Sequence, residues 1–402
     1  MIRKAGVITF FASPVALFML AHFSHHLINS LLQPLLPFIR DDFGMNYTQA
    51  AWIVSAFTFA YGISQLPAGW LADRIGSRFL LLIGTVGVAI CGLLIGFSPT
   101  YSIMVVFLVL LGILGGGYHP AASPLVSASV EEKNRGRALG IHQIGGTGSF
   151  FLSPIIAVGV AGFFGGWRAS FIILAVITVL FSTFFYIRLS RRLSSSQPEY
   201  SSNAANKTDS IPVSGSMKRL VAFIILGVTL QISIFSATSF IPLYAVDHFM
   251  ESEAIGAALL SVAHFSGLWA GPLGGYISDR IGKVPVMLTV CLLAGPVIFL
   301  LSLVSMNITI WAVLLVLGAL MYVGMPVTES YVITHSPEKH RSTILGIYYF
   351  ASRGGPALIM PVFGSLLDYF SFGMAFTATG VAALVITLGC SLFLWGSREK
   401  QH

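Results

Sequence analysis

Long apolar runs separated by short charged segments fill most of this 402-residue sequence. A helix needs about 20 apolar residues to cross the hydrocarbon core of a bilayer. Twelve runs reach about that length, at residues 13–38, 48–71, 79–97, 101–127, 137–163, 168–188, 219–243, 253–277, 285–304, 307–333, 342–367 and 373–395. Because 55% of the residues are apolar and only 9% are charged, an ordinary soluble domain is excluded. The sequence predicts an all-α membrane protein with twelve transmembrane helices.

These runs form two sets of six, because a sequence pattern returns 206 positions further on. The stretch from Gly69 to Gly76 (GWLADRIG) is echoed by the stretch from Gly275 to Gly282 (GYISDRIG). The same offset pairs Pro120 with Pro326, Glu132 with Glu338, Arg135 with Arg341, Leu139 with Leu345 and Gly140 with Gly346. Several matches at one offset indicate an internal duplication. We expect six-helix bundles at 1–189 and 218–402, joined by a flexible, Ser-rich cytoplasmic linker at 190–217.

The distribution of cations predicts the orientation. With both termini in the cytoplasm, nineteen Lys and Arg residues fall on the inner side and only Arg40 and Arg168 on the outer side. We therefore expect a multi-pass protein of the cell (inner) membrane with both termini cytoplasmic. The first run follows Arg3 and Lys4, as in a signal peptide, but no clear cleavage site follows, so we interpret it as a retained helix.

Composition also limits the partners. The cations are dispersed in short loops rather than clustered with aromatic residues, so no nucleic-acid partner is expected. The three cysteines lie in apolar runs without CxxC spacing, and we predict neither a metal site nor a disulfide framework. No nucleotide-binding GxxxxGK[ST] motif and no GxSxG or HExxH motif occurs, so we expect no cofactor, no ATP-driven transport and no enzyme activity.

The two six-helix repeats, the central linker and the duplicated GxLADRxG turn together resemble the major facilitator superfamily. That resemblance implies two halves that rock about a central site, with the Asp of the turn latching the halves in the outward-open state. It assigns the latch to Gly69, Asp73 and Arg74, and the echo in the second half to Asp279 and Arg280. A solvated loop is the alternative for a single copy, but finding both copies favours a shared mechanical role.

Within this superfamily the chain is most similar to the fosmidomycin-resistance branch. The similarity rests on Ser24-His25-x-x-x-Asn29, on His119-Pro120 and on the segment from Gly136 to Gly146. Asn29 stands where that branch tends to have an acid.

Arg353 is the sharpest candidate for a binding residue. It lies about a dozen residues into the eleventh run, near the bilayer midplane at 1.5 Å per residue. A charge there costs at least about 2.5–3.5 kcal/mol, so it usually faces a cavity. The guanidinium suits a carboxylate, phosphate or phosphonate. The alternative is an internal ion pair or carbonyl clamp. Since no acid lies at matching depth, we favour binding of the substrate or of a substrate-linked anion.

The first run carries a cluster of polar residues, namely His22, His25, His26, Asn29 and Gln33. Positions 22, 26, 29 and 33 share one helix face, and 25 with 29 forms an overlapping face. One such histidine is more often a packing residue, whereas three near the middle of one helix favour a cavity wall. A proton relay is a further alternative, with His22 as a candidate.

Other polar candidates lie in later runs. His119 precedes Pro120, and His142 and Gln143 precede two glycines; we assign the bends to architecture and the side chains to the site. The further substrate candidates are Gln231 and Tyr349. Glu329, the clearest intramembrane acid, either carries the coupling proton or forms an inner gate with Arg137 or Arg341, and we favour the gate.

The sequence thus predicts a monomeric secondary transporter that moves a small, anionic organic solute through the lipid bilayer by alternating access, coupled to protons. The alternative is a multidrug or fosmidomycin-type efflux pump with a broad apolar cavity in which Arg353 is structural. A membrane enzyme or a signalling transceptor is disfavoured, because the chain has neither a catalytic motif nor a long cytoplasmic domain.

Overall fold

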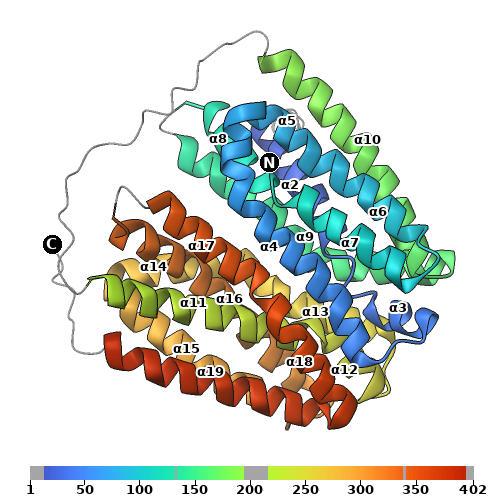
Figure 1. Cartoon of the computed structure of the whole chain (residues 1–402), viewed down its shortest axis with the longest axis vertical. Coiled ribbons are helices and arrows are strands. Elements are labelled where there is room, and N and C mark those ends of the chain that lie inside the picture. The colour runs from blue at the N-terminus through green and yellow to red at the C-terminus, as the bar shows by residue number, and fades with distance from the viewer. Residues whose placement is uncertain (1–12, 132–133, 194–215, 338–340, 395–402) are drawn as a thin grey trace, which may run out of the picture.

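A computed structural model describes residues 13–131, 134–193, 216–337 and 341–394, and every regular element in them is a helix (Figure 1). The first half contains α2 (Pro14–Asn29), α3 (Leu36–Phe43), α4 (Tyr47–Ile75), α5 (Ser77–Leu82), the π-helical turn η1 (Ile83–Gly87), α6 (Val88–Gly96), α7 (Tyr101–Gly115), α8 (Tyr118–Ala128), α9 (Arg135–Phe164) and α10 (Trp167–Leu193). The second half contains α11 (Ser216–Ser239), α12 (Ile241–Asp247), α13 (Glu253–Phe265), the short 3-10 turn η3 (Ser266–Leu268), α14 (Ala270–Ile281), α15 (Lys283–Leu300), α16 (Ile308–His335), α17 (Arg341–Gly354), α18 (Pro356–Tyr369) and α19 (Phe372–Leu394).

The all-α membrane class is confirmed. Eight helical spans in the described residues are long and apolar enough to cross a membrane, and a ninth is counted if the bent pair Glu253–Leu268 and Ala270–Ile281 forms one span. The other three expected spans correspond to α2 with α3, to α4, and to α17 with α18. The count of twelve therefore remains a prediction for these three segments.

The first expected span is divided by prolines. Pro14 opens α2 behind Ser13, whose side chain accepts a hydrogen bond from the Ala16 amide at 3.2 Å. The helix ends at Asn29, and α3 begins only at Leu36. Pro34 and Pro37 lack the amide hydrogen that a continuous helix would need, so the sequence run 13–38 becomes two helices instead of one.

The helices of the two halves gather in two groups, which Figure 1 shows as blue to green and as green to red ribbons. They meet where α4 packs against α17 and α18, where α9 packs against α13, and where α3 contacts α12. The expected linker lies mostly outside the described residues, and the domain boundaries remain predictions.

The duplicated turns have the same backbone geometry in both halves. Gly76 has φ +85° and Gly282 has φ +93°, backbone angles that residues with a Cβ atom rarely adopt. The Arg74 guanidinium lies 4.3 Å from the ring centroid of Trp70, and that of Arg280 lies 4.5 Å from Tyr276. The side-chain surroundings of Gly69 and Asp73 lie outside the described part of the chain, and Asp279 is exposed, so the latch remains a prediction.

Candidate functional site

A cavity of about 600 Å³ lies between the two groups of helices. Its wall comes from α4, α8 and α9 on one side and from α11, α16 and α17 on the other. Polar side chains make up much of this wall: Gln65, His119, Ser123, His142, Gln143, Gln231, Glu329, Tyr348, Tyr349, Ser352 and Arg353. A smaller cavity of about 90 Å³ shares Gln231 and Arg353 with it and is also lined by His26, Asn29 and Tyr61, among others.

Arg353 lines both cavities and lies at a break in the helix. It is the second-last residue of α17, and α18 starts at Pro356. The end of α17 passes very close to α4, because a Cβ on Gly62 would lie 2.6 Å from the Cα of Gly354. The Arg353 side chain is exposed, and it makes no hydrogen bond or ion pair with the described residues. Its guanidinium therefore lines a space between the halves without a paired acid among the described residues.

Glu329 of α16 also lines the large cavity and is half-buried. The Tyr349 hydroxyl donates a hydrogen bond of 2.5 Å to its carboxylate. Of the expected gate partners, Arg137 is exposed and the Arg341 side chain lies outside the described residues. The gate remains a prediction, and Tyr349 is the partner that the structure gives to Glu329.

The histidines of α2 are buried against α9 and α8. Glycines bring the helices together, because a Cβ on Gly145 would lie 2.0 Å from the Met19 carbonyl oxygen and one on Gly146 would lie 2.6 Å from Cε1 of His22. This close approach lets His22 Nδ1 donate to the carbonyl oxygen of His142 at 2.8 Å. A carbonyl only accepts, so the proton is on Nδ1 and Nε2 of the neutral ring keeps a free lone pair.

His25 is held behind the cavity wall rather than in it. Its Nδ1 donates to the carbonyl oxygen of Gly84 at 2.7 Å, within the π-helical turn η1, where the backbone pattern is locally altered. Its Nε2 accepts from the Asn29 amide at 3.0 Å, and its ring stacks on Tyr118 with centroids 4.3 Å apart. His25 therefore fixes the position of its neighbours, whereas Asn29 reaches the smaller cavity.

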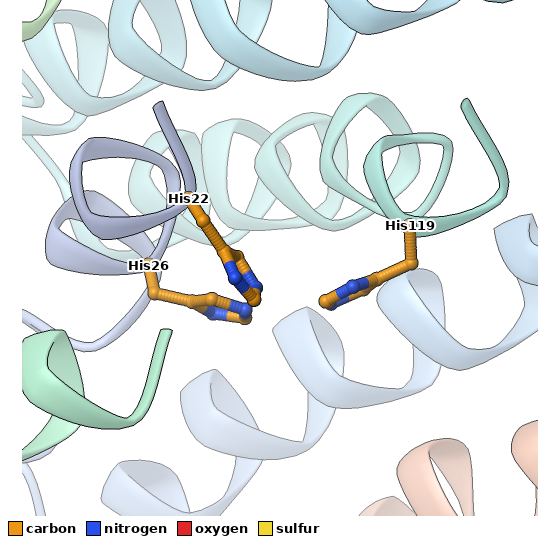
Figure 2. A group of neighbouring side chains, drawn as sticks. All are labelled: His22, His26 and His119. Atoms are coloured by element: carbon orange, nitrogen blue, oxygen red, sulfur yellow. The ribbon is translucent and has the colours of Figure 1, made fainter. Parts of the chain in front are cut away.

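Three histidines point toward one another from two helices (Figure 2): His22 and His26 of α2 and His119 of α8. Their ring centroids are 4.8 Å apart for His22 and His26, 5.1 Å for His22 and His119, and 5.3 Å for His26 and His119. Nε2 of His22 and Nδ1 of His26 are buried and have no hydrogen-bond partner among the residues that the structure describes. His119 is half-buried and lines the large cavity, so the trio connects the buried cluster with the cavity.

Most of the predicted binding residues thus gather around one space. The large cavity is lined by His119, His142, Gln143, Gln231, Tyr349 and Arg353, and the small one by His26, Asn29, Gln231 and Arg353. His22 and His25 are buried behind them.

Sequence reasoning missed several wall and support residues, three of which are Gln65, Tyr118 and Phe150. Gln65 lines the large cavity, Tyr118 stacks on His25, and Phe150 lies with its ring centroid 4.7 Å from that of His26. A glutamine inside an apolar run was a usable signal for Gln65, but aromatic residues are too common in such runs for a pattern to single out Tyr118 or Phe150.

At the opposite end of the interface, side chains connect the two halves directly. We call this region, which contains α3, the start of α4, α12 and the end of α18, the Asp247 end. Asp247 of α12 pairs with the Arg40 guanidinium of α3 and accepts from the Tyr47 hydroxyl of α4 at 2.7 Å. Its carboxylate therefore joins both halves through charge-assisted hydrogen bonds.

A second carboxylate at this end caps a helix of the other half. Asp368 of α18 accepts from the backbone amides of Tyr47 and Thr48 at 2.8 and 2.9 Å, at the start of α4. An acid at a helix N-terminus satisfies free amides and complements the helix dipole. A further hydrogen bond between the halves runs from the Gln33 side-chain amide to the Ser239 hydroxyl at 2.7 Å. The two halves are thus closed together at the Asp247 end.

The comparison with protein-family models decides the family. The chain matches the Major Facilitator Superfamily over residues 18–323 and, in a second overlapping match, over 252–402. The chain belongs to the major facilitator superfamily. As a member it is a multi-pass membrane transport protein and not an enzyme, which confirms those predictions.

Curated superfamily members are similar to it. The multidrug resistance protein MdtG of Proteus mirabilis (strain HI4320) is 28% identical over 314 residues, which cover 76% of each chain. The probable sulfoacetate transporter SauU of Cupriavidus necator is 32% identical over 154 residues, which cover 37% of this chain and 35% of that one. The resemblance to the fosmidomycin-resistance branch remains a prediction.

Solved transporter structures share the fold. A POT family transporter in complex with 5-aminolevulinic acid has a TM-score of 0.77 at 17% identity and covers 94% of this chain and 95% of its own. The peptide transporter POT in complex with sulfate also has a TM-score of 0.77, at 15% identity, and covers 95% and 94%. At these identities the likeness shows the fold alone.

Proposed function

We propose that this protein is a secondary transporter for a small organic anion, which binds in the large cavity against Arg353. The supporting observation is that Arg353 lines both cavities with no acid paired to it in the described residues. A guanidinium in a space between membrane helices stabilises an anion strongly, because the surroundings screen charge poorly. Among the relatives, one is named for sulfoacetate, itself a small organic anion.

The neutral polar residues of the wall select the substrate. Gln231, Gln143 and His119 offer hydrogen bonds without adding charge, so the anion gains orientation without binding too tightly for release. An anion of carboxylate, sulfonate or phosphonate type with a short body matches a cavity of about 600 Å³.

The structure supports an inward-open state of the transport cycle. The Asp247 end, which is extracellular in the predicted topology, is closed by contacts between the halves. The cavity instead extends toward Leu139 and Gly346, which lie near the starts of α9 and α17, the ends of these helices that face the cytoplasm in that topology. Rocking of one half on the other would then move the opening to the Asp247 end.

We further propose that Glu329 carries the coupling proton. It lines the same cavity as Arg353, and its carboxylate accepts a hydrogen bond from the Tyr349 hydroxyl. A protonated Glu329 would leave Arg353 as the stronger anion attractor, so proton and anion binding would support each other.

Liposome measurements test this proposal. Currents on solid-supported membranes are recorded for small carboxylates, sulfonates and phosphonates, with and without a pH gradient. We expect a saturable anion current in the wild type that falls at least about tenfold in Arg353→Ala, since a hydrogen bond to a charged group contributes about 1.5–3 kcal/mol, and partial retention in Arg353→Lys. Glu329→Gln should keep anion exchange but lose the response to the pH gradient.

A matched control is Arg188→Ala, since Arg188 lies over the ring of Phe184 on α10, away from the cavity. Equal currents in Arg353→Ala and the wild type would contradict the anion-carrier function.

The second candidate function is multidrug efflux, which the 28% identity to MdtG favours. An efflux pump would protect cells against unrelated compounds and would tolerate Arg353→Ala. Growth of cells that express the two forms on a panel of antibiotics, fosmidomycin included, separates the two functions.

A further inference from the structure

We infer that His22, His26 and His119 form a binding site for a divalent first-row transition metal, and that the transported anion enters as the ligand that completes its coordination. The metal site stands on the histidine geometry alone. The second part rests on the proposed anion-carrier function.

The three imidazoles are arranged as a metal-binding set. One ring nitrogen from each lies within 4.8 Å of the others. His22 and His26 are four residues apart on α2, so one helix presents both, and His119 approaches from α8 (Figure 2). A tetrahedral ion with metal–nitrogen bonds of about 2.0–2.1 Å needs donors about 3.4 Å apart. Binding an ion would therefore require the imidazoles to rotate about their side-chain bonds until the donors reach that spacing.

The surroundings prepare His22 as a ligand. Metal-bound histidines usually donate their second ring nitrogen to a carbonyl or carboxylate, which fixes the tautomer. His22 Nδ1 makes that bond to the His142 carbonyl, and its Nε2 is buried without a partner. Nδ1 of His26 is also buried without a partner. Two unpaired buried nitrogens cost free energy unless something binds them.

Packing alone does not account for this arrangement. His25 and His142 resemble packing residues, because His25 bonds to Gly84 and Asn29, and Nε2 of His142 lies 3.2 Å from the Tyr118 hydroxyl. The trio differs, because His22 Nε2 and His26 Nδ1 have no hydrogen-bond partner among the described residues, and one ring nitrogen of each member lies within 4.8 Å of the others. Neutral imidazoles suit zinc, copper, nickel and iron rather than magnesium or calcium.

The charge of the proposed site favours an anion as the ligand that completes the coordination of the metal ion. Three neutral histidines leave a bound divalent ion uncompensated, and no acid of the described residues lies in the trio or lines the small cavity. Three protein ligands leave a fourth position open, as in zinc sites that bind water or substrate. An anion there would bridge the ion and Arg353, which lines the cavity on the opposite half.

Metal binding to the purified protein tests the site directly. The full chain in detergent is titrated with Zn²⁺ against a chromophoric chelator. We expect one Zn²⁺ per chain in the wild type and at least tenfold weaker binding in His119→Ala and in His26→Gln. The matched control is His264→Ala, since His264 is buried in the other half and bonds to the Tyr322 hydroxyl at 2.9 Å. No Zn²⁺ binding above the detergent blank, or equal binding in the variants, would overturn the site.

A second measurement uses only the wild-type protein, so its result does not depend on whether the variants fold. Co²⁺ in a four-coordinate site absorbs visible light far more strongly than hydrated Co²⁺. We expect that absorption on adding one equivalent of Co²⁺ and its loss on adding Zn²⁺. A spectrum equal to that of Co²⁺ in buffer would count against the site.

Transport in liposomes separates this inference from the proposed function. We expect the Arg353-dependent anion current to fall at least about tenfold in the presence of EDTA and to return with Zn²⁺. If the chain binds Zn²⁺ but EDTA does not change the anion current, the ion is structural, and the hypothesis that the anion bridges the ion and Arg353 is wrong. If Zn²⁺ does not bind but the current remains, the anion carrier stands without the metal.

Discussion

Gly146 illustrates at the residue scale how the absence of a side chain shapes the histidine cluster. A Cβ there would lie 2.6 Å from Cε1 and 2.8 Å from Nε2 of His22. Gly146→Ala should therefore turn His22 away from the His142 carbonyl, although alanine favours helix by about 1 kcal/mol. We expect a net destabilisation of about 1–3 kcal/mol from overpacking, together with a raised KM for transport. Thermal unfolding and substrate titration measure both.

Gly148→Ala is the control on the same helix, because a Cβ on Gly148 meets nothing within 4 Å. It should be as stable as the wild type or slightly more so. An equal loss in both variants would show that α9 tolerates no alanine, and the account based on His22 would fail.

At the scale of helices, the crossing of α4 and α17 fixes where Arg353 lies. A Cβ on Gly62 would lie 2.6 Å from both the Cα and the N of Gly354, which are backbone atoms that cannot turn aside. Gly62→Ala should lower the free energy of unfolding by about 1–3 kcal/mol, visible as a lower Tm. Gly346→Ala on α17 should not, because its Cβ would meet only Leu66, at an ordinary 3.9 Å. A Tm unchanged by Gly62→Ala would contradict this crossing.

Sequence patterns identify the helices better than their breaks and partners. The run 13–38 meets the length of a span, yet Pro34 and Pro37 divide it, and the run 342–367 contains the break at Gly354. Arg353 and the histidines could be found because a polar group within an apolar run is costly. The pairing of Asp247 with Arg40 and of Asp368 with Thr48 could not be predicted from the sequence. The partners are about 200 and 320 positions apart, and their contact depends on how the two halves pack together.

At the scale of the whole molecule, the contacts at the Asp247 end hold the two halves together on that side. Asp247→Asn removes the charge from the bonds to Arg40 and Tyr47, worth about 1.5–3 kcal/mol. We expect the population to shift about ten- to a hundredfold toward the state open at that end. Spin labels at Phe163→Cys and Ile308→Cys, both on exposed sites of different halves, would report longer distances. The native cysteines are buried, which favours labelling at the introduced sites.

Asp42→Asn provides the comparison at the same end. Asp42 pairs with Arg168 within the first half, so its loss should leave the distance between halves unchanged. A shift of the same size in Asp42→Asn would point to a general charge effect rather than to the bridge.

The matching turns at Gly76 and Gly282 also bear on the internal duplication of the chain. Both need a backbone conformation that favours glycine, which agrees with the internal duplication indicated by the sequence repeat. The walls of the cavity then diverged. At the same offset, His22, His26 and His119 correspond to Val228, Ile232 and Met325, while the second copy holds Arg353 and Glu329. The two copies share this turn but differ in the chemistry that they bring to the cavity, with imidazoles in the first and charges in the second.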